Sequence, residues 1–438
     1  MKKSLLIALS FASAVAVAGP VVDQTTVEMK QPAGIGPVEI SYVLSDAPAV
    51  ITVDVQTNAG DGAWASIGDG NVRTLSGDVN RLVQPSAMPR KIVWKPHRDW
   101  PDHLIGGENT RAVVEVWPTN APPEVMVIDL ERGEPAFYRS EAAMPFAVTD
   151  DVCVTTKLVM RKMPAANARW QMGTATALIP KNDKGQSGDK VTGMQENQHY
   201  VAFNEDFYMA VYPITQGQYD VLKAKAPSFP SLRRVNVGDA LPQAFLSHNA
   251  CRGTAPAINW PLTGHAVDGK SILGCLRGYV GYGVEFDMPT EAQWEFACRA
   301  GTTGNWYYGD AYSEEHCWSG GKDKPCDVRY SRNPWGLYGM YGNCGNHCLD
   351  FKNTRGYDGS AYEARQPEII NPTGEAAAGA DAGALRATRG GYYSLALDGA
   401  NPSAVFCRSG ARYRYITNGA SDVWSLRLVA PCAIGGAK

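Results

Sequence analysis

The ten cysteines carry the most distinctive chemistry in this chain. They are Cys153, Cys251, Cys275, Cys298, Cys317, Cys326, Cys344, Cys348, Cys407 and Cys432. A cysteine thiolate can act as a nucleophile, bind a soft metal ion or pair in a disulfide. The four from Cys317 to Cys348 suggest a four-thiolate zinc site, but their C-x8-C and C-x3-C spacings match the common zinc motifs poorly. Disulfides and zinc both stay open, since spacing alone does not fix the pairing.

Other catalytic patterns are absent from the sequence. There is no G-x-S-x-G motif and no P-loop, and Gly281-Tyr282-Gly283 lacks the third glycine of a dinucleotide-binding fingerprint. Acidic residues such as Asp220 and Glu295 are interpreted as parts of solvated helix faces. We therefore predict no catalytic residues from these patterns.

The composition favours a protein with short strands and long loops. Charged residues make up 19% of the 438 residues, below the usual quarter, whereas Gly (45), Pro (28), Trp (11) and Tyr (20) are abundant. This mixture argues against disorder and against a coiled coil. The net charge of −3, without long runs of one sign, gives no electrostatic support for binding nucleic acid or a membrane surface.

The first 18 residues have the pattern of a secretion signal. Lys2 and Lys3 precede an apolar run, and Ala16-Val17-Ala18 is a small-residue cleavage site. Cleavage after Ala18 would change the net charge from −3 to −5 by removing two lysines. We therefore expect an exported protein, periplasmic or extracellular. No later stretch approaches 18 apolar residues, so no membrane insertion is expected.

Residues 19–131 are predicted to form a β-sandwich. Short runs of β-branched residues are separated by turn residues, a spacing typical of such domains. The expected strands are 38–43, 50–55, 91–94, 111–117 and 125–128. Residues 132–151 are interpreted as a linker.

Residues 152–432 are predicted to form a second domain with three short helices. Thr215 and Thr290 each precede a glutamine by three positions, as in a capping box that begins a helix. The helix after Thr290 is expected to end at Gly301. A third helix is expected after Asp268, with an apolar side that includes Ile272 and Leu276.

This second region resembles the formylglycine-generating enzyme family, also called the sulfatase-modifying factor domain family. The resemblance covers about 280 residues, and its most specific stretch is Met-Pro-Thr-Glu-Ala-Gln-Trp-Glu-Phe-Ala-Cys-Arg-Ala-Gly at 288–301. Further matching stretches follow the family's order at 170–173, 199–201, 207–219, 333–343, 389–391, 407–409 and 426–429. The resemblance implies a loop-rich C-type-lectin-like fold. The expected fold class is therefore α+β, an N-terminal β-sandwich followed by this lectin-like domain.

The resemblance also implies a copper chemistry whose ligands this chain does not supply in full. The family's enzymes oxidise a substrate cysteine to formylglycine with O₂ and Cu(I), which two cysteines five positions apart bind. One of these positions matches Cys407, and the other matches Pro402, which cannot bind a metal. A shifted pair of Cys407 with Cys432 is an alternative. Copper is not expected.

A structural calcium site of the family matches the loop from Gly339 to Asn346. Calcium prefers several hard oxygen ligands that include carboxylates. Here Gly339 has no side chain and Asn346 has no charge, so a residual site would use the backbone carbonyls of Gly342 and Cys344 together with Asn346. The resemblance leaves this calcium open.

The favoured hypothesis is a non-catalytic binding protein of this family. We expect it to bind a protein, peptide or glycan through C-terminal loops rich in tyrosine and arginine, residue types common in recognition surfaces. The predicted binding residues are Tyr393, Arg408, Arg412, Tyr413, Arg414, Tyr415 and Trp424. The alternatives are a formylglycine-generating oxidase that activates sulfatases and a purely structural role.

Overall fold

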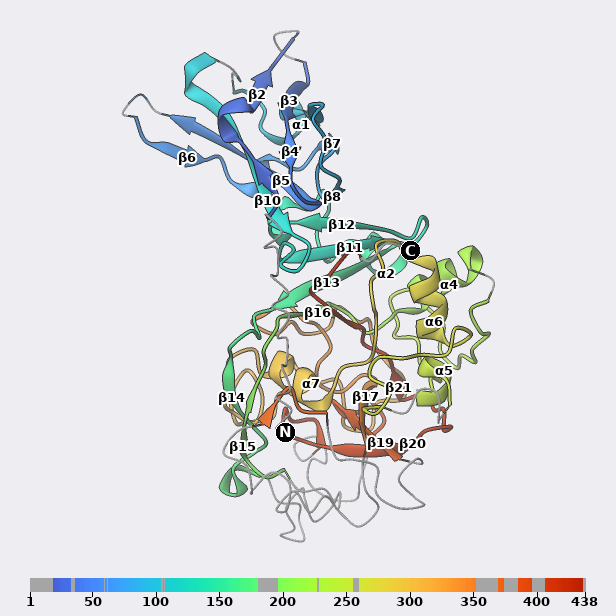
Figure 1. Cartoon of the computed structure of the whole chain (residues 1–438). Helices are drawn as coiled ribbons and strands as arrows, with labels where there is room; N and C mark the ends of the chain where they lie inside the picture. The colour runs from blue at the N-terminus through green and yellow to red at the C-terminus, as the bar shows by residue number, and fades with distance from the viewer. Residues whose placement is uncertain are drawn as a thin grey trace, which may run out of the picture. The chain divides into compact units, whose positions relative to one another are not determined.

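The computed structural model describes residues 19–32, 36–58, 60, 62–103, 105, 107–179, 196–226, 228–254, 260–351, 369–373, 385–395 and 406–435 (Figure 1). The predicted signal segment 1–18 and Pro402 lie outside the described residues. The chain divides into two compact units. The first comprises Met1–Gly68 and Thr74–Pro118, and the second comprises Asp69–Arg73 and Thr119–Lys438.

The first unit is built from antiparallel sheets, which confirms the predicted sheet-rich N-terminal region. Strand β3 shows why: Val38, Ile40 and Tyr42 are buried while the residues between them are partly exposed, the alternation of a half-buried strand. The sheet orders are β2-β3-β9-β7, β10-β5-β6 with β8 also on β5, and β1-β4. The strands are β1 (Val21–Val22), β2 (Glu28–Lys30), β3 (Val38–Tyr42), β4 (Leu44–Ser45), β5 (Ala49–Asn58), β6 (Trp64–Ser66), β7 (Leu75–Gly77), β8 (Arg81–Val83), β9 (Arg90–Trp94) and β10 (Thr110–Pro118), and the one α-helix described here is α1 (Pro96–Asp99).

The second unit begins earlier than the sequence analysis expects. Strand β11 (Val125–Asp129), placed by prediction in the β-sandwich, pairs along its whole length with β13 (Lys157–Met163) and β12 (Glu134–Tyr138) of the second unit. The predicted linker, residues 132–151, therefore contains strand β12, which belongs to the same sheet as β11. Strand composition identifies β11 correctly but does not say which sheet it joins, and the boundary drawn at residue 131 differs from the observed one for this reason.

Three sheets form the frame of the second unit. Their orders are β12-β11-β13-β16-β22, β14-β15-β18 and β20-β19-β17-β21. The strands are β11 (Val125–Asp129), β12 (Glu134–Tyr138), β13 (Lys157–Met163), β14 (Arg169–Met172), β15 (His199–Ala202), β16 (Phe207–Ala210), β17 (Gly345–Phe351), β18 (Ile369–Ile370), β19 (Leu385–Arg389), β20 (Tyr413–Ile416), β21 (Trp424–Ser425) and β22 (Val429–Pro431). The α-helices are α2 (Val152–Thr155), α4 (Gln216–Lys225), α5 (His248–Arg252), α6 (Ile272–Tyr279) and α7 (Glu291–Arg299). The mixed architecture confirms the α+β class.

The three predicted helices are present as α4, α6 and α7. Both capping boxes form: Thr215 accepts a hydrogen bond from the Gln218 N–H, and Thr290 accepts one from the Gln293 N–H. Helix α7 ends at Arg299, two residues before the predicted stop at Gly301, because Ala300 already adopts a left-handed conformation with φ of 48°. Sequence signals at helix ends therefore placed these elements well.

The cap of α7 gives a first testable prediction. Replacing Thr290 by alanine leaves the Gln293 N–H without its acceptor, and we expect the free energy of unfolding to fall by about 1 kcal/mol. Thr290→Ser keeps the hydroxyl and should retain most of that stability. Equal losses in the two variants, measured by chemical denaturation, would contradict a capping role.

Candidate functional site

Two of the three arginines of the predicted binding surface are buried in ion pairs. Arg408 is fully buried, and its guanidinium contacts both carboxylate oxygens of Glu196 at 2.7 and 2.8 Å. Arg412 is 4% exposed and donates its Nε to Glu291 at 3.1 Å. The assignment of these residues to a ligand-binding surface was wrong, because each guanidinium balances an interior carboxylate.

Helix α7 supplies two buried glutamates that pair with buried arginines, and these ion pairs form an interior charge network. Glu291 and Glu295 are both buried and both contact the guanidinium of Arg389, at 2.8 and 3.1 Å. Burial would raise the pKa of Glu295, but the guanidinium groups of Arg299 and Arg389 outweigh it and lower the pKa. Glu295 is therefore an interior anion and not part of a solvated helix face as predicted, whereas Asp220 is exposed as expected. The network fixes α7 against the C-terminal segments.

The predicted aromatic binding residues also pack mostly inside. Tyr393 and Trp424 are 3% and 4% exposed, and the Tyr393 hydroxyl donates to Asp422 at 2.9 Å. The Trp424 ring lies 5.5 Å from that of Tyr415. The assignment of Tyr393 and Trp424 to a binding surface was therefore wrong. Tyr413, Arg414 and Tyr415 lie on β20 with partial exposure, so their role in binding stays a prediction.

Of the residues proposed for residual calcium, the Asn346 side chain is already engaged within the protein. The side-chain oxygen of Asn346 already accepts hydrogen bonds from the Trp294 indole at 3.0 Å and from the Arg427 guanidinium at 3.3 Å. A guanidinium cation at this position repels calcium. The Cys344 thiol contacts the Asp422 carbonyl, and burial raises the pKa of this thiol, so it stays neutral. The expected ligands at Gly342 and Cys344 are backbone carbonyls, so calcium bound through them stays a prediction without a contribution from the Asn346 side chain.

The zinc alternative also finds no support. Within the part of the chain that the structure describes, no three His, Cys, Asp or Glu side chains are grouped so that they could hold a metal ion.

Strand β17 carries a histidine whose burial makes stability depend on pH. Burial lowers the pKa of His347 to about 4, although a hydrogen bond to the Leu246 carbonyl acts in the opposite direction. In the unfolded chain the His347 ring is protonated near pH 6.5, whereas in the folded chain it is protonated only near pH 4. The contribution of His347 is therefore complete above pH 6.5 and is lost as the pH falls toward 4.

We expect His347→Gln to reduce this acid sensitivity. Between pH 7 and 4.5 the wild-type chain should lose about 2–3 kcal/mol more unfolding free energy than the variant. The neighbouring His248 has its pKa lowered in the same direction and keeps part of the effect in both proteins. Identical pH profiles from denaturant titrations would contradict this origin.

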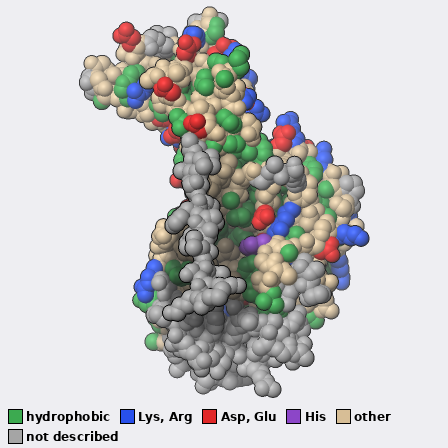
Figure 2. Space-filling model, viewed as in Figure 1, with side chains coloured by type: hydrophobic (Ala, Val, Ile, Leu, Met, Phe, Trp, Pro, Cys, Tyr) green, Lys and Arg blue, Asp and Glu red, His purple; other side chains and the backbone are tan. Residues whose placement is uncertain are grey.

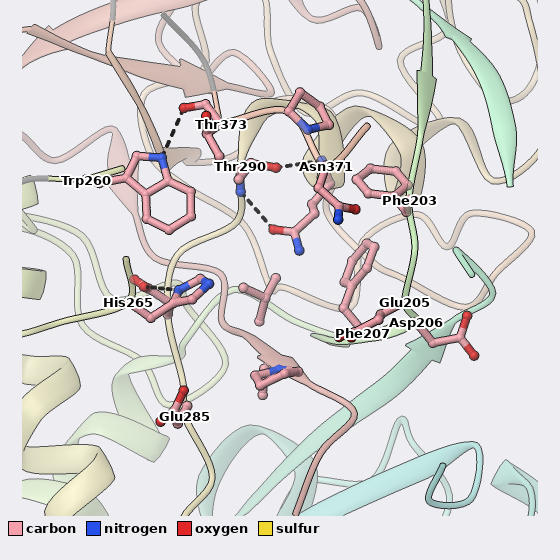
Figure 3. A pocket seen from close by; sticks show the side chains of 16 residues that line it. Phe203, Glu205, Asp206, Phe207, Trp260, His265, Glu285, Thr290, Asn371 and Thr373 are labelled. Atoms are coloured by element: carbon pink, nitrogen blue, oxygen red, sulfur yellow. Dashed lines mark hydrogen bonds and ion pairs between the residues drawn. The ribbon is translucent and has the colours of Figure 1, made fainter. Parts of the chain in front are cut away.

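One pocket of about 240 Å³ lies within the second unit (Figure 3). Trp260 and His265 lie on one side of it, and Phe203 and Phe207 lie on the other. In the space-filling view a histidine and an acidic side chain are visible next to each other on this unit (Figure 2). The lining residues are Phe203, Glu205, Asp206, Phe207, Trp260, His265, Glu285, Asp287, Thr290, Gln293, Asn371, Pro372, Thr373, Val429, Ala430 and Pro431.

An aspartate–histidine pair stands at the edge of this pocket. The Nδ1 of His265 lies 2.8 Å from the Asp287 carboxylate, and the side chain of His265 is 45% exposed. Asp287 is 1% exposed and is also paired with Arg252 at 3.0 Å. Its backbone forms two hydrogen bonds with Val429. Because a carboxylate can only accept, Nδ1 carries the proton, so Nε2 is the ring nitrogen left for a ligand.

The described lining favours binding over covalent catalysis. It includes no cysteine, serine or lysine. Of its two threonines, Thr290 is engaged as the cap of α7. The charged groups are instead carboxylates, among them Glu205 and Glu285, whose residues are exposed. An aromatic wall with carboxylates and one oriented histidine can hold a polar, positively charged group, but no described lining residue is a ready nucleophile.

Sequence reasoning missed this pocket because its residues come from segments far apart in the chain. The only local signal is that Asp287 directly precedes the stretch 288–301, whose capping box places Thr290 and Gln293. His265 and Trp260 lie in a turn region without any motif. Their proximity, with ring centroids 4.9 Å apart, depends on tertiary structure.

The second unit thus has the build of a loop-rich α+β domain with an interior arginine–glutamate network. Residues 169–431 match the family model described as the sulfatase-modifying factor enzyme 1-like domain. The chain therefore belongs to the sulfatase-modifying factor family, as the sequence motifs predict. Among the described residues no helix has the length and apolar character needed to cross a membrane.

Individual relatives are more distant. The serine/threonine-protein kinase pkn1 of Chlamydia caviae is 31% identical over 135 residues, which are 31% of this chain and 20% of that protein. The chain thus spans only about a fifth of that relative's length.

Similar solved structures include the Treponema denticola variable protein 1 (17% identity, 65% of this chain and 98% of that chain, TM-score 0.42). PvdO from Pseudomonas aeruginosa is 18% identical over 62% of this chain and 94% of its own, with a TM-score of 0.43. CarF is 15% identical over 61% and 99%, with a TM-score of 0.35.

Proposed function

We propose that this protein is an exported, non-catalytic member of the sulfatase-modifying factor family that binds a protein or peptide ligand. The pocket holds a positively charged side chain of that ligand. The pocket at His265 is the proposed site, in place of the C-terminal loop surface. The observation that carries the proposal is the charge of the pocket. Carboxylates from separate segments line it, and no lysine or arginine is present among its described lining residues.

Charge complementarity points to a lysine or arginine side chain as the occupant. Glu205 and Glu285 lie on segments about 80 residues apart, and Trp260 adds an aromatic ring that favours contact with a cation. Asp206 contributes less, because one of its oxygens accepts the N–H groups of Ala165 and Ala166 at 2.8 Å. A cavity of about 240 Å³ accommodates one long side chain rather than a folded segment.

An array that carries both peptides and glycans tests the ligand class. The purified chain should be retained by peptides that contain lysine or arginine and not by the same peptides with glutamine at those positions. Retention by glycans alone, or by neutral and basic peptides equally, would overturn the proposal.

The oxidase alternative has a separate test. The chain is incubated with a sulfatase-type peptide, Cu(I) and O₂, and the peptide is examined by mass spectrometry. We expect the peptide mass to stay unchanged. Turnover to the aldehyde product would show that the protein is an enzyme.

A further inference from the structure

Two buried cysteines from distant segments meet in the core of the second unit. Cys317 and Cys407 are both 0% exposed and belong to the same hydrophobic cluster, although about 90 residues separate them in sequence. The Cys317 thiol donates a hydrogen bond to the Cys407 sulfur. Cys407, whose partner position in the family resemblance is Pro402, therefore has a thiol neighbour.

Backbone contacts fix the two segments against each other. The hydroxyl of Ser319, two positions after Cys317, donates to the Tyr392 carbonyl at 2.8 Å, and the Gly342 N–H donates to the Gly390 carbonyl at 2.7 Å. Gly342 itself forms a bridge with Trp318, the residue that follows Cys317. On the other side, a Cβ at Gly391 would lie 2.2 Å from the Cys407 sulfur, so only glycine fits there. Several independent contacts thus hold the sulfur of Cys407 beside the 317–319 segment.

We propose that Cys317 and Cys407 form a disulfide in the protein exposed to an oxidising compartment. The oxidant is an oxidised dithiol–disulfide exchange partner. The Cys407 thiolate attacks one sulfur of that partner's disulfide, which breaks and leaves a mixed disulfide. The Cys317 thiolate then attacks the Cys407 sulfur and releases the partner as a dithiol. The two protein thiols lose two electrons and two protons, which the partner gains.

The timing and consequence of this cross-link follow from burial. Because both sulfurs are inaccessible in the folded unit, the bond forms before packing closes over them. In the folded unit the Cys317 thiol beside Cys407 outweighs burial and lowers the pKa of Cys407. Once formed, the bond closes a loop of about 90 residues, a length for which restricting the unfolded chain is strongly stabilising.

The cross-link is tested on the full chain expressed into the oxidising periplasm of a bacterial host. Free thiols are trapped with N-ethylmaleimide in denaturant, and the digest is examined by mass spectrometry. We expect one species that joins the peptides of Cys317 and Cys407, with a mass two hydrogens below their sum. N-ethylmaleimide on both cysteines, or a bond from either one to a different cysteine, would overturn the proposal.

Thermal unfolding provides a second readout that does not depend on recovering the linked peptides from a digest. Reductant should lower the unfolding midpoint of the wild-type chain by roughly 5 °C. The same shift is expected for Cys348→Ala, a control at a cysteine that is equally buried in the same cluster. The double variant Cys317→Ala, Cys407→Ala should show no shift, and an unchanged sensitivity to reductant in it would contradict the bond. Neither readout depends on ligand binding, so failure here leaves the proposed pocket function untouched.

Discussion

Replacing Arg389 by alanine lowers the free energy of unfolding by about 3–5 kcal/mol. Arg389 is fully buried between Glu291 and Glu295, and it also donates to the carbonyls of Ser409 and Ala411. Burial would lower the pKa of Arg389, but the two carboxylates outweigh it and raise the pKa. The alanine variant therefore leaves two interior carboxylates with one positive partner fewer.

Denaturant titration with two further variants isolates this effect. Arg332→Ala removes an arginine that pairs with Glu141 at 2.8 Å but is 44% exposed, and it should cost less than about 1 kcal/mol. Arg389→Lys keeps the charge but has only one nitrogen to contact the two glutamates, so we expect an intermediate loss of unfolding free energy. If Arg389→Ala costs no more than Arg332→Ala, the interior network does not stabilise the fold as argued.

Reversing the charge of Glu285 should weaken the binding of an arginine-containing peptide by roughly 10–100-fold. Glu285 lies on the pocket lining with its residue exposed, so Glu285→Lys should fold normally. The lysine brings a positive charge to a pocket that we propose holds one from the ligand. Glu285→Gln, which only removes the carboxylate charge, should show a smaller loss in the same titration.

A matched surface variant separates local from general charge effects. Glu131 is exposed in the same unit and does not line the pocket, so Glu131→Lys makes the same change in net charge. The affinity of this variant for the arginine-containing peptide should stay within about twofold of wild type, because salt screens an exposed charge that does not line the pocket. Equal losses for Glu131→Lys and Glu285→Lys would mean that the peptide binds through the overall charge and not in the pocket.

Local signals predicted several of the elements but not how they assemble. The capping boxes at Thr215 and Thr290 predict α4 and α7 because a cap depends on residues only three positions apart. Strand β11 was also predicted, yet its sheet was not, because pairing with β13 depends on residues about 30 positions away. The domain boundary therefore required the structure.

The candidate site could not be predicted because exposure is a tertiary property. Alternating arginine and tyrosine from Arg408 onward is typical of a recognition surface, but Arg408 and Arg412 meet Glu196 and Glu291 from distant segments and are buried. The pocket at His265 shows the converse, since no motif marks its residues. The proximity of Cys317 to Cys407 was missed for the same reason, because the two cysteines lie about 90 residues apart in different loops.

The central claim, a pocket that recognises a positive charge, is tested most directly by calorimetric titration of the full chain with two peptides. The peptides differ only in one side chain, arginine in the first and its neutral isostere citrulline in the second. We predict that the arginine peptide binds at least about tenfold more tightly and that Glu285→Lys abolishes the difference. Equal affinity of the wild-type chain for the two peptides, or no binding of either, would contradict the account.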